Sequence, residues 1–137
     1  MKTVETVSLI LVRGGRILAE RRRRDEAIFP GAVVVPGGHV EPGESPEEAG
    51  RRELREELGV DCSHFTPVDR ALCPAGAEDQ LNTWFLCEEW KGEPRCLEAA
   101  GLLWIGPGEV EVLDLAFDRA VMGRFFERLQ KPDPAKA

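Results

Sequence analysis

The amino-acid sequence predicts an α/β protein, in which a mixed β-sheet lies between helices. Short β-branched segments predict the strands, and two segments with helical signals, one mid-chain and one near the end, predict helices that cover the sheet. The chain has 137 residues, 42% of them hydrophobic, which is enough for one cored domain and too few for two ordinary ones. We therefore expect a single domain over residues 1–130 and a flexible tail over residues 131–137.

Strand-like segments dominate the first third of the chain. Residues 4–12 are mainly β-branched or apolar, and two consecutive glycines at 14–15 separate them from residues 17–21, so this region predicts a β-hairpin. Residues 33–35 are consecutive valines and predict a short strand. The Pro-, Gly- and Glu-rich residues 36–45 that follow predict a loop.

A helix is predicted over residues 46–58, because both of its ends carry specific signals. Ser45 is a favourable N-cap, Pro46 fits the first helical position, and Glu48 completes a Ser-x-x-Glu capping box. Gly59 suits the left-handed conformation that ends many helices. This helix therefore has a defined start and a defined end in the sequence.

Further elements are expected after this helix. Residues 68–73 and 81–90 predict two strands, and residues 102–105 predict another short one. Residues 115–129 carry apolar side chains at helical spacing and predict a C-terminal helix. A sheet with a helix on either side is the layered arrangement that these elements build most easily.

The charge of the chain excludes function classes that rely on attraction to polyanions. Its net charge is −7 and its pI is about 4.9, so neither a nucleic acid polymer nor an anionic membrane is an expected partner. The sequence has no run of 18 or more apolar residues and does not begin with a charged and then apolar leader. We therefore expect a soluble, cytoplasmic protein.

The cysteines favour buried free thiols over a metal site or disulfides. They are irregularly spaced, no Cys-x-x-Cys pair occurs, and only two histidines are present to complete a zinc site. The four cysteines are Cys62, Cys73, Cys87 and Cys96.

Three glutamates of the predicted helix lie on one face. Glu53, Glu56 and Glu57 stand at positions i, i+3 and i+4. Leu54 and Leu58 form a different stripe, which can pack on the sheet while the acidic face looks outward into a cleft. Like charges this close repel one another, and magnesium, a hard cation that prefers oxygen ligands, would relieve that repulsion.

A second interpretation of the same helix needs no metal. Arginines alternate with the acids, and Arg52 and Glu56 form an i, i+4 pair, so the helix can be an exposed element with surface ion pairs. Taken alone, the helix leaves both interpretations open.

The residues around this helix resemble the Nudix box, a long pattern in which nine residues are specified at fixed spacing over 23 positions. The matching residues are Gly38, Glu44, Arg52, Glu53, Leu54, Glu56, Glu57, Gly59 and Val60. The resemblance implies the Nudix fold, an α/β/α sandwich around a mixed β-sheet. It also implies a hydrolase that cuts the pyrophosphate linkage of a nucleoside diphosphate or triphosphate derivative.

The same resemblance implies a metal site. Mg²⁺, with Mn²⁺ as an alternative, would be held by Glu53, Glu56 and Glu57, and the backbone carbonyl of Gly37 would complete the protein's share of the ligands. Glu98 falls where the MutT branch of the family carries an additional acidic residue near the metal.

The resemblance also indicates catalytic roles. Arg52 would orient acidic neighbours, notably Glu44, through a charge-assisted pair. Glu53 is the first choice for the general base, and Glu44 and Glu98 are the alternates.

Outside the box the chain resembles the MutT branch, so a nucleoside triphosphate, whether oxidised or not, is the expected small-molecule substrate, with a nucleoside monophosphate and pyrophosphate as products. Arg21 is expected to contact phosphate, and Phe29 and Trp84 can either stack on a base or belong to the core. Asp118 falls where the family places a side chain that recognises the purine edge. MutT has an amide there, so a carboxylate leaves preference for 8-oxoguanine open. Gly38 completes the expected substrate-binding residues, which are Arg21, Phe29, Gly38, Trp84 and Asp118.

Two alternative functions remain from the sequence. An ADP-ribose, nucleotide-sugar or other nucleoside diphosphate derivative is the alternative substrate class, and a non-catalytic nucleotide-binding Nudix module is the alternative from outside enzymology. Every specified acid is present, which favours an enzyme. The sequence leaves both a monomer and a homodimer open.

Overall fold

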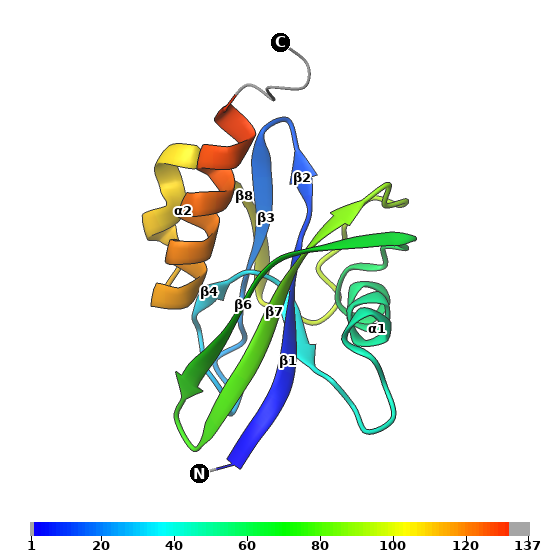
Figure 1. Ribbon diagram of the computed structural model, residues 1–137, viewed down its shortest axis with the longest axis vertical. Coiled ribbons are helices and arrows are strands. Elements are labelled where there is room, and N and C mark those ends of the chain that lie inside the picture. Colours follow the sequence, from blue (N-terminus) through cyan, green and yellow to red (C-terminus); the bar gives the residue numbers. More distant parts are fainter. Residues whose placement is uncertain (1, 132–137) are drawn as a thin grey trace.

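The computed structural model describes residues 2–131, and its strands lie between two helices. Figure 1 shows α1 (Pro46–Leu58) on one side of the strands and α2 (Ala116–Gln130) on the other. The α/β/α layering predicted from the sequence is therefore confirmed. The predicted tail over 131–137 lies almost wholly outside the described residues.

The first sheet is mixed and has four strands in the order β5-β1-β7-β6. β1 runs parallel to β7, with Thr6 opposite Asn82, whereas the other two strand pairs are antiparallel. The strands are β1 (Lys2–Ile10), β5 (Gly37–His39), β6 (His64–Ala75) and β7 (Glu78–Glu88).

The second sheet is antiparallel and is built around β3, which pairs with β2, β4 and β8. Gly14 and Gly15 form the turn between β2 and β3 with φ of 60° and 75°, so the predicted hairpin is present. Most of the predicted first strand of this hairpin, residues 4–12, does not pair with β3, because residues 2–10 form β1 of the first sheet. The strands are β2 (Val12–Arg13), β3 (Arg16–Arg21), β4 (Val33–Val34) and β8 (Gly101–Ile105).

Alternation along β1 builds two hydrophobic cores, one under each helix. Val7 and Leu9 pack in the core that contains Leu54 and Leu58 of α1, whereas Ile10 packs in the core that contains α2. Leu54 and Leu58 are fully buried, and burying such a side chain stabilises the fold by about 2 kcal/mol. These two leucines fix the face of α1 that meets the sheets.

Several elements differ from the prediction. β5 falls in the segment expected to be a loop, and a 3-10 helix, η1 (Pro107–Val112), was not predicted. β6 extends beyond the predicted 68–73 at both ends, and β7 begins three residues earlier and ends two residues earlier than the predicted 81–90, because the antiparallel backbone pairing continues through residues with little strand preference, such as Pro67, Pro74 and Asp79. The cysteines are free thiols as expected, and all but the exposed Cys96 are buried.

Neither helix in residues 2–131 has the length and apolar character needed to cross a membrane.

Candidate active site

The ends of α1 are fixed by the residues that predicted them. The Ser45 hydroxyl accepts a hydrogen bond from the Glu48 amide at 3.1 Å, and the Glu48 carboxylate accepts one from the Ser45 amide at 3.1 Å. Gly59 ends the helix with φ of 67°. The helix therefore holds its glutamates in a set rotation and register relative to the sheets.

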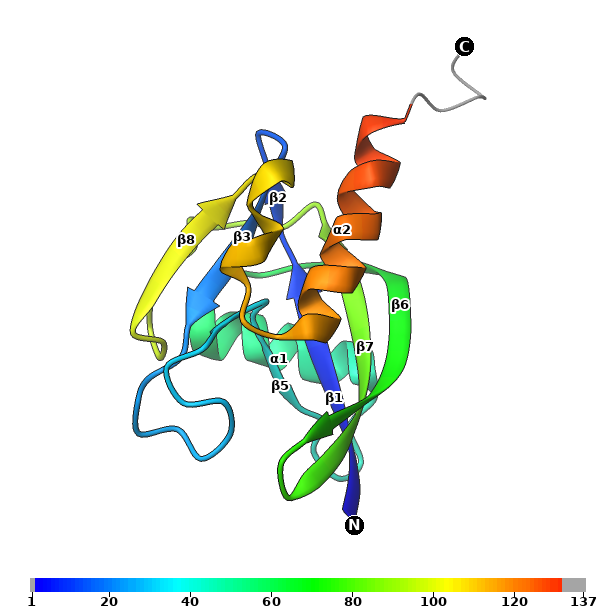
Figure 2. The same ribbon diagram turned by 90° about the vertical axis from the view of Figure 1, so that its left-hand side faces the viewer.

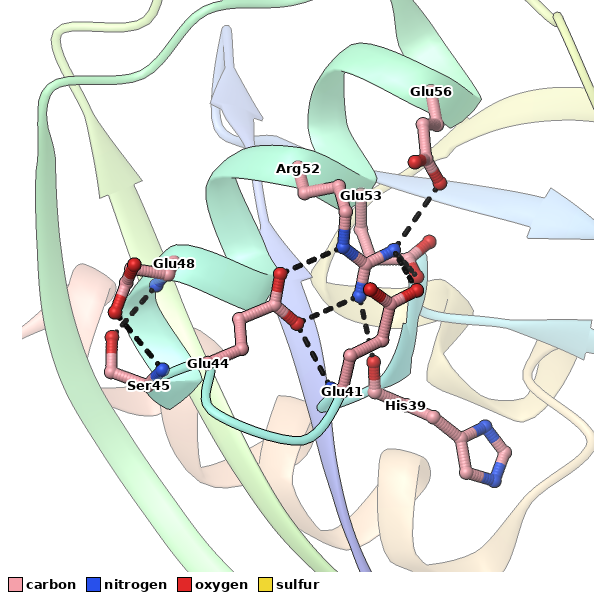
Figure 3. A network of polar contacts seen from close by, with 8 residues as sticks. All are labelled: His39, Glu41, Glu44, Ser45, Glu48, Arg52, Glu53 and Glu56. Carbon is pink, nitrogen blue, oxygen red and sulfur yellow. Dashed lines mark hydrogen bonds and ion pairs between the residues drawn. The ribbon is translucent and has the colours of Figure 1, made fainter.

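Arg52 gathers the carboxylates around it, as Figure 3 shows. Its Nε and Nη2 donate to the two oxygens of Glu44 at 2.8 and 2.9 Å, and Nη2 also donates to the carbonyl of His39 at 2.9 Å. Its Nη1 donates to Glu53 at 2.9 Å and to Glu56 at 3.3 Å. This side chain joins the loop before α1 to the acidic face of α1.

The bidentate pair between Arg52 and Glu44 has a clear electrostatic consequence. The hydrogen bonds from Arg52 lower the pKa of Glu44 to about 2, and the same bonds raise the pKa of Arg52. Glu44 therefore stays ionised and occupied by the guanidinium, as the predicted orienting role of Arg52 requires.

The acidic face of α1 is more deeply placed than predicted. Glu53 is 9% exposed and Glu57 is 8% exposed, so the expectation that all three acids look outward is wrong for two of them. Glu56 alone is exposed. The physical reason is that Glu53 and Glu57 are sequence neighbours of Leu54 and Leu58, and the leucines draw that edge of the helix against the strands.

Glu57 is a buried acid without a complete set of partners. Its Oε2 is buried and has no hydrogen-bond partner among the described residues. Burial, together with the charge of Glu20, raises the pKa of Glu57 well above its usual range. A buried carboxylate oxygen in this state costs free energy unless a proton or a cation satisfies it.

Glu20 belongs to the same group of acids and was missed by the sequence analysis. It lies on β3 on the same side as Leu18, which packs against α1, and it is 3% exposed. Burial raises the pKa of Glu20 to about 7, and Glu53 and Glu98 add to the shift. A charged residue inside an apolar strand, at the position i+2 from a core leucine, was the available signal. We refer to Glu20, Glu53, Glu56 and Glu57 as the acidic cluster.

Glu98 lies on a loop that is hydrogen-bonded to Glu57 of this cluster on one side and to Arg21, the neighbour of Glu20, on the other. The Leu97 amide donates to the Glu57 carbonyl at 3.1 Å, and the Ala100 amide donates to the Arg21 carbonyl at 2.9 Å. The Glu98 side chain is exposed, and its charge raises the pKa of Glu53, although burial is the larger cause. The structure therefore brings Glu98 near the box acids.

Gly37 and Gly38 form the closest approach of β5 to its neighbours. A Cβ atom on Gly37 would overlap the Val7 carbonyl, and one on Gly38 would overlap the Glu53 carboxylate. Only glycine fits at 37, because the overlap there is with backbone, whereas a side chain at 38 would displace the Glu53 carboxylate. The carboxylate of Glu53 is thus seated directly against the backbone of β5.

The chemistry of these residues fits a hard divalent cation. All of the donors are oxygens, Glu57 has an unsatisfied buried oxygen, and the glycine at 38 leaves room for Glu53. Within residues 2–131, no three Asp, Glu, His or Cys side chains already converge on one point. The present arrangement has Arg52 bonded to Glu53 and Glu56, so these two side chains would have to turn to share a cation.

A cavity of about 270 Å³ lies on the other side of Gly37 and Gly38. Arg22 lines it, whereas Arg21 is exposed and donates to the Gly31 carbonyl at 3.1 Å instead. β1 and β7 contribute polar residues to the cavity lining, which are Thr6, Ser8, Gln80 and Asn82.

Four of the five predicted substrate residues, Gly38 among them, line this cavity, and Arg21 does not. Phe29 and Trp84 both line it, although Trp84 is only 1% exposed and belongs to the core under α2. Asp118 lines it from the first turn of α2 and accepts hydrogen bonds from Trp84 Nε1 at 3.0 Å and from the Val35 amide at 3.1 Å. Phe85 lies in the opposite core, beneath α1, so it is a core residue.

The fold and the site together define an α/β/α protein with a carboxylate-rich site beside a ligand-sized cavity. The chain belongs to the NUDIX family, because the sequence model of the NUDIX domain matches residues 2–129. It is a Nudix hydrolase of the MutT-like kind.

Two proteins of Escherichia coli strain K12 illustrate the similarity. The chain is 37% identical to an 8-oxo-dGTP diphosphatase over 89 residues, which are 64% of this chain and 67% of that protein. It is 34% identical to a CTP pyrophosphohydrolase over 121 residues, which are 85% of each chain. The crystal structure of a MutT NUDIX hydrolase from Burkholderia pseudomallei superposes with a TM-score of 0.76 at 27% identity, and the match covers 89% of this chain and 97% of that one.

Proposed function

We propose that this pyrophosphohydrolase converts a nucleoside triphosphate to the nucleoside monophosphate and pyrophosphate and that it depends on magnesium. The observation that carries the proposal is the position of Gly38, which lines the cavity together with Gly37 and lies directly against the Glu53 carboxylate. A nucleoside held in the cavity would extend its phosphates past these glycines toward the acidic cluster. The relatives named for 8-oxo-dGTP and CTP are consistent with this substrate class.

Magnesium would reconcile an acidic protein with a polyanionic substrate. Glu53, Glu56 and Glu57 would hold it with the Gly37 carbonyl, and Glu98 would add a charge from the neighbouring loop; Mn²⁺ accepts the same oxygen donors. When bound, the cation would neutralise charge on the phosphate oxygens and lower the pKa of a bound water. The net charge of −7 makes such local compensation necessary.

Among the glutamates, Glu53 is the best placed to accept a proton from the attacking water. Its carboxylate lies against Gly38, at the junction of the cavity and the acidic cluster. Glu44 is less suitable, because both of its oxygens accept hydrogen bonds from Arg52. Arg52 is therefore a positioning residue, and Glu98 remains the alternate base.

Arg22 is the arginine we assign to the substrate phosphates in place of Arg21. It lines the cavity, its Nε donates to the Ile28 carbonyl at 2.8 Å, and its Nη2 donates to Glu26 at 3.2 Å, so its Nη1 has no partner among these contacts. The guanidinium retains donors for a phosphate oxygen. Phe29 is placed to cover a base from the same loop.

The direct test is Glu53→Gln, assayed with nucleoside triphosphates, ADP-ribose and nucleotide sugars and with products identified by mass. The amide keeps the size of the side chain and an acceptor for Arg52, so the fold should persist while kcat/KM falls by about 100-fold or more. Glu47→Gln is the matched control, because Glu47 is an exposed acid of the same helix and should leave kcat/KM unchanged.

Three outcomes contradict the proposal. Undiminished turnover by the Glu53→Gln variant, or by the wild type in excess chelator, would remove the metal-dependent chemistry. Preference for ADP-ribose or a nucleotide sugar would assign the other substrate class. Nucleotide binding without any product in Mg²⁺ or Mn²⁺ would identify a binding module.

A further inference from the structure

The floor of the cavity is made of three buried polar residues, which no role described above requires. Thr6 and Ser8 on β1 and Asn82 on β7 are 5%, 8% and 6% exposed. The Thr6 hydroxyl donates to Asn82 Oδ1 at 2.7 Å, and Asn82 Nδ2 donates to Ser8 Oγ at 3.0 Å. We call these three residues the polar floor.

The polar floor interrupts two apolar strand faces. On β1 the row Thr6, Ser8 leads to Ile10, and on β7 Asn82 leads to Trp84; Ile10 and Trp84 both pack in the core under α2. Apolar side chains at the floor would simply extend that core, and a buried hydroxyl or amide costs free energy unless it is hydrogen-bonded. The polarity is therefore matched to the cavity that these residues line.

Each member of the polar floor keeps hydrogen-bonding capacity beyond the bonds it already makes. The Asn82 amide has a second N–H and a second lone pair on Oδ1, and the Ser8 hydroxyl keeps its own proton to donate. An amide that offers one donor and one acceptor side by side is complementary to the edge of a nucleobase.

Two carboxylates at the opposite wall supply acceptors only. Asp114 accepts from the Val33 amide at 2.7 Å, and Asp118 accepts from both Val35 and Trp84. These donors hold both side chains as acceptors, each carboxylate oxygen can accept more than one hydrogen bond, and both residues line the cavity. An exocyclic amino group on a base would donate to them, whereas a keto oxygen would face another negatively polarised oxygen.

We propose that the polar floor and the two aspartates select nucleotides whose base carries an exocyclic amino group, as cytosine and adenine do, over bases with a keto oxygen in its place. Asn82, whose amide orientation is fixed by Thr6 and Ser8, holds the base edge so that its amino group meets the acceptors, which makes Asn82 a specificity-determining residue together with the two aspartates. This inference rests on the proposed function, since it assigns the cavity to the base of the substrate.

The test compares substrates that differ only by amino or keto at one position, CTP with UTP and ATP with ITP. The wild type should prefer the amino member of at least one pair by about 10-fold in kcat/KM. Asn82→Leu and, as a milder change, Thr6→Val should bring that ratio close to one, mainly by lowering kcat/KM for the amino substrate. Thr83→Val, the next residue of β7 and on the opposite face, is the control and should keep the ratio.

The same comparison is made by calorimetry with the monophosphates, CMP against UMP and AMP against IMP. If no triphosphate is hydrolysed, the proposed function fails, and the binding ratios still decide the base preference. The inference is overturned by a wild type that favours keto bases or does not discriminate. It is also overturned by a folded Asn82 variant that weakens both members of a pair equally, because Asn82 would then be structural only.

Discussion

The acidic cluster and the polar floor lie at the edges of the two cores, and they differ in how their buried polar groups find hydrogen-bond partners. The polar floor is neutral, and its three side chains hydrogen-bond to one another. The acidic cluster consists of ionisable groups: Arg52 donates to Glu53 and Glu56 but to neither Glu20 nor Glu57, and one Glu57 oxygen has no partner among the described residues. In Figure 2 the α2 helix lies in front of the strands and α1 behind them, so the two groups occupy opposite layers.

The comparison shows that the buried polar groups of the polar floor have partners within the protein, whereas those of the acidic cluster do not all have one. A neutral network whose members satisfy one another rigidifies its surroundings and can recognise a ligand by shape and hydrogen bonding. A group of buried carboxylates with one unsatisfied oxygen stores unfavourable free energy that a cation would release. The cavity side is thus built for recognition, and the α1 side is built to be completed by a ligand.

The largest effect is expected from Arg52→Met, which removes the guanidinium that pairs with Glu44, Glu53 and Glu56. Glu44 and Glu53 would lose their ion pairs in a partly buried setting, so the free energy of unfolding should fall by about 3 kcal/mol. Arg52→Lys should recover only part of it, because an ammonium cannot donate to both oxygens of Glu44 as a fork does. Urea denaturation in chelator measures these differences.

Arg55→Met is the control for Arg52, since Arg55 makes an exposed ion pair with Asp61 from the same helix. Its loss should change stability by less than about 1 kcal/mol. Equal effects of the two substitutions would show that Arg52 is an ordinary surface residue.

The next effect comes from Asp118→Asn on the cavity side. The carboxylate accepts from Val35 and Trp84, and an amide of the same size accepts with its oxygen only, so one buried donor loses its partner. Stability at pH 8 should therefore fall by about 2 kcal/mol. The near-ultraviolet circular dichroism of Trp84 reports the same loss locally, and an unchanged unfolding midpoint contradicts the idea that this side is electrostatically complete.

The smallest effect, and one of opposite sign, is expected from Glu20→Gln. This change neutralises a buried carboxylate beside Glu57, so the chelated protein should become more stable by about 1 kcal/mol at pH 8. Adding Mg²⁺ should narrow the gap to the wild type, because a cation relieves the same repulsion. If the Glu20→Gln variant is less stable than the wild type in chelator, the Glu20 carboxylate already has favourable partners. The two substitutions, Glu20→Gln and Asp118→Asn, would then no longer have opposite effects on stability.

Local signals determined the parts of the site that lie within one segment. The helix 46–58 was predicted with its observed bounds, because Ser45, Glu48 and Gly59 act through bonds to residues only a few positions away. The short strand at β5 could not be predicted in the same way. Its residues pair with β1, some 30 positions earlier in the chain, and glycines carry no strand preference.

Burial and convergence explain the remaining differences. That Glu53 and Glu57 are buried while Glu56 is exposed depends on how the Leu54 and Leu58 stripe meets the strands, which the helical spacing does not contain. Arg22 rather than Arg21 lines the cavity, because the direction of a side chain just after a strand is set by the loop that follows.

By itself, the sequence determined the layered α/β class, the capped helix and the set of acids that this helix carries, because each depends on neighbours along the chain. Only the tertiary structure decided that Glu20 joins those acids, that Thr6, Ser8 and Asn82 form one hydrogen-bonded floor, and that Gly38 lies between the Glu53 carboxylate and the cavity. The physical reason is that such groups act through distance in space, and strand pairing brings together residues more than 70 positions apart.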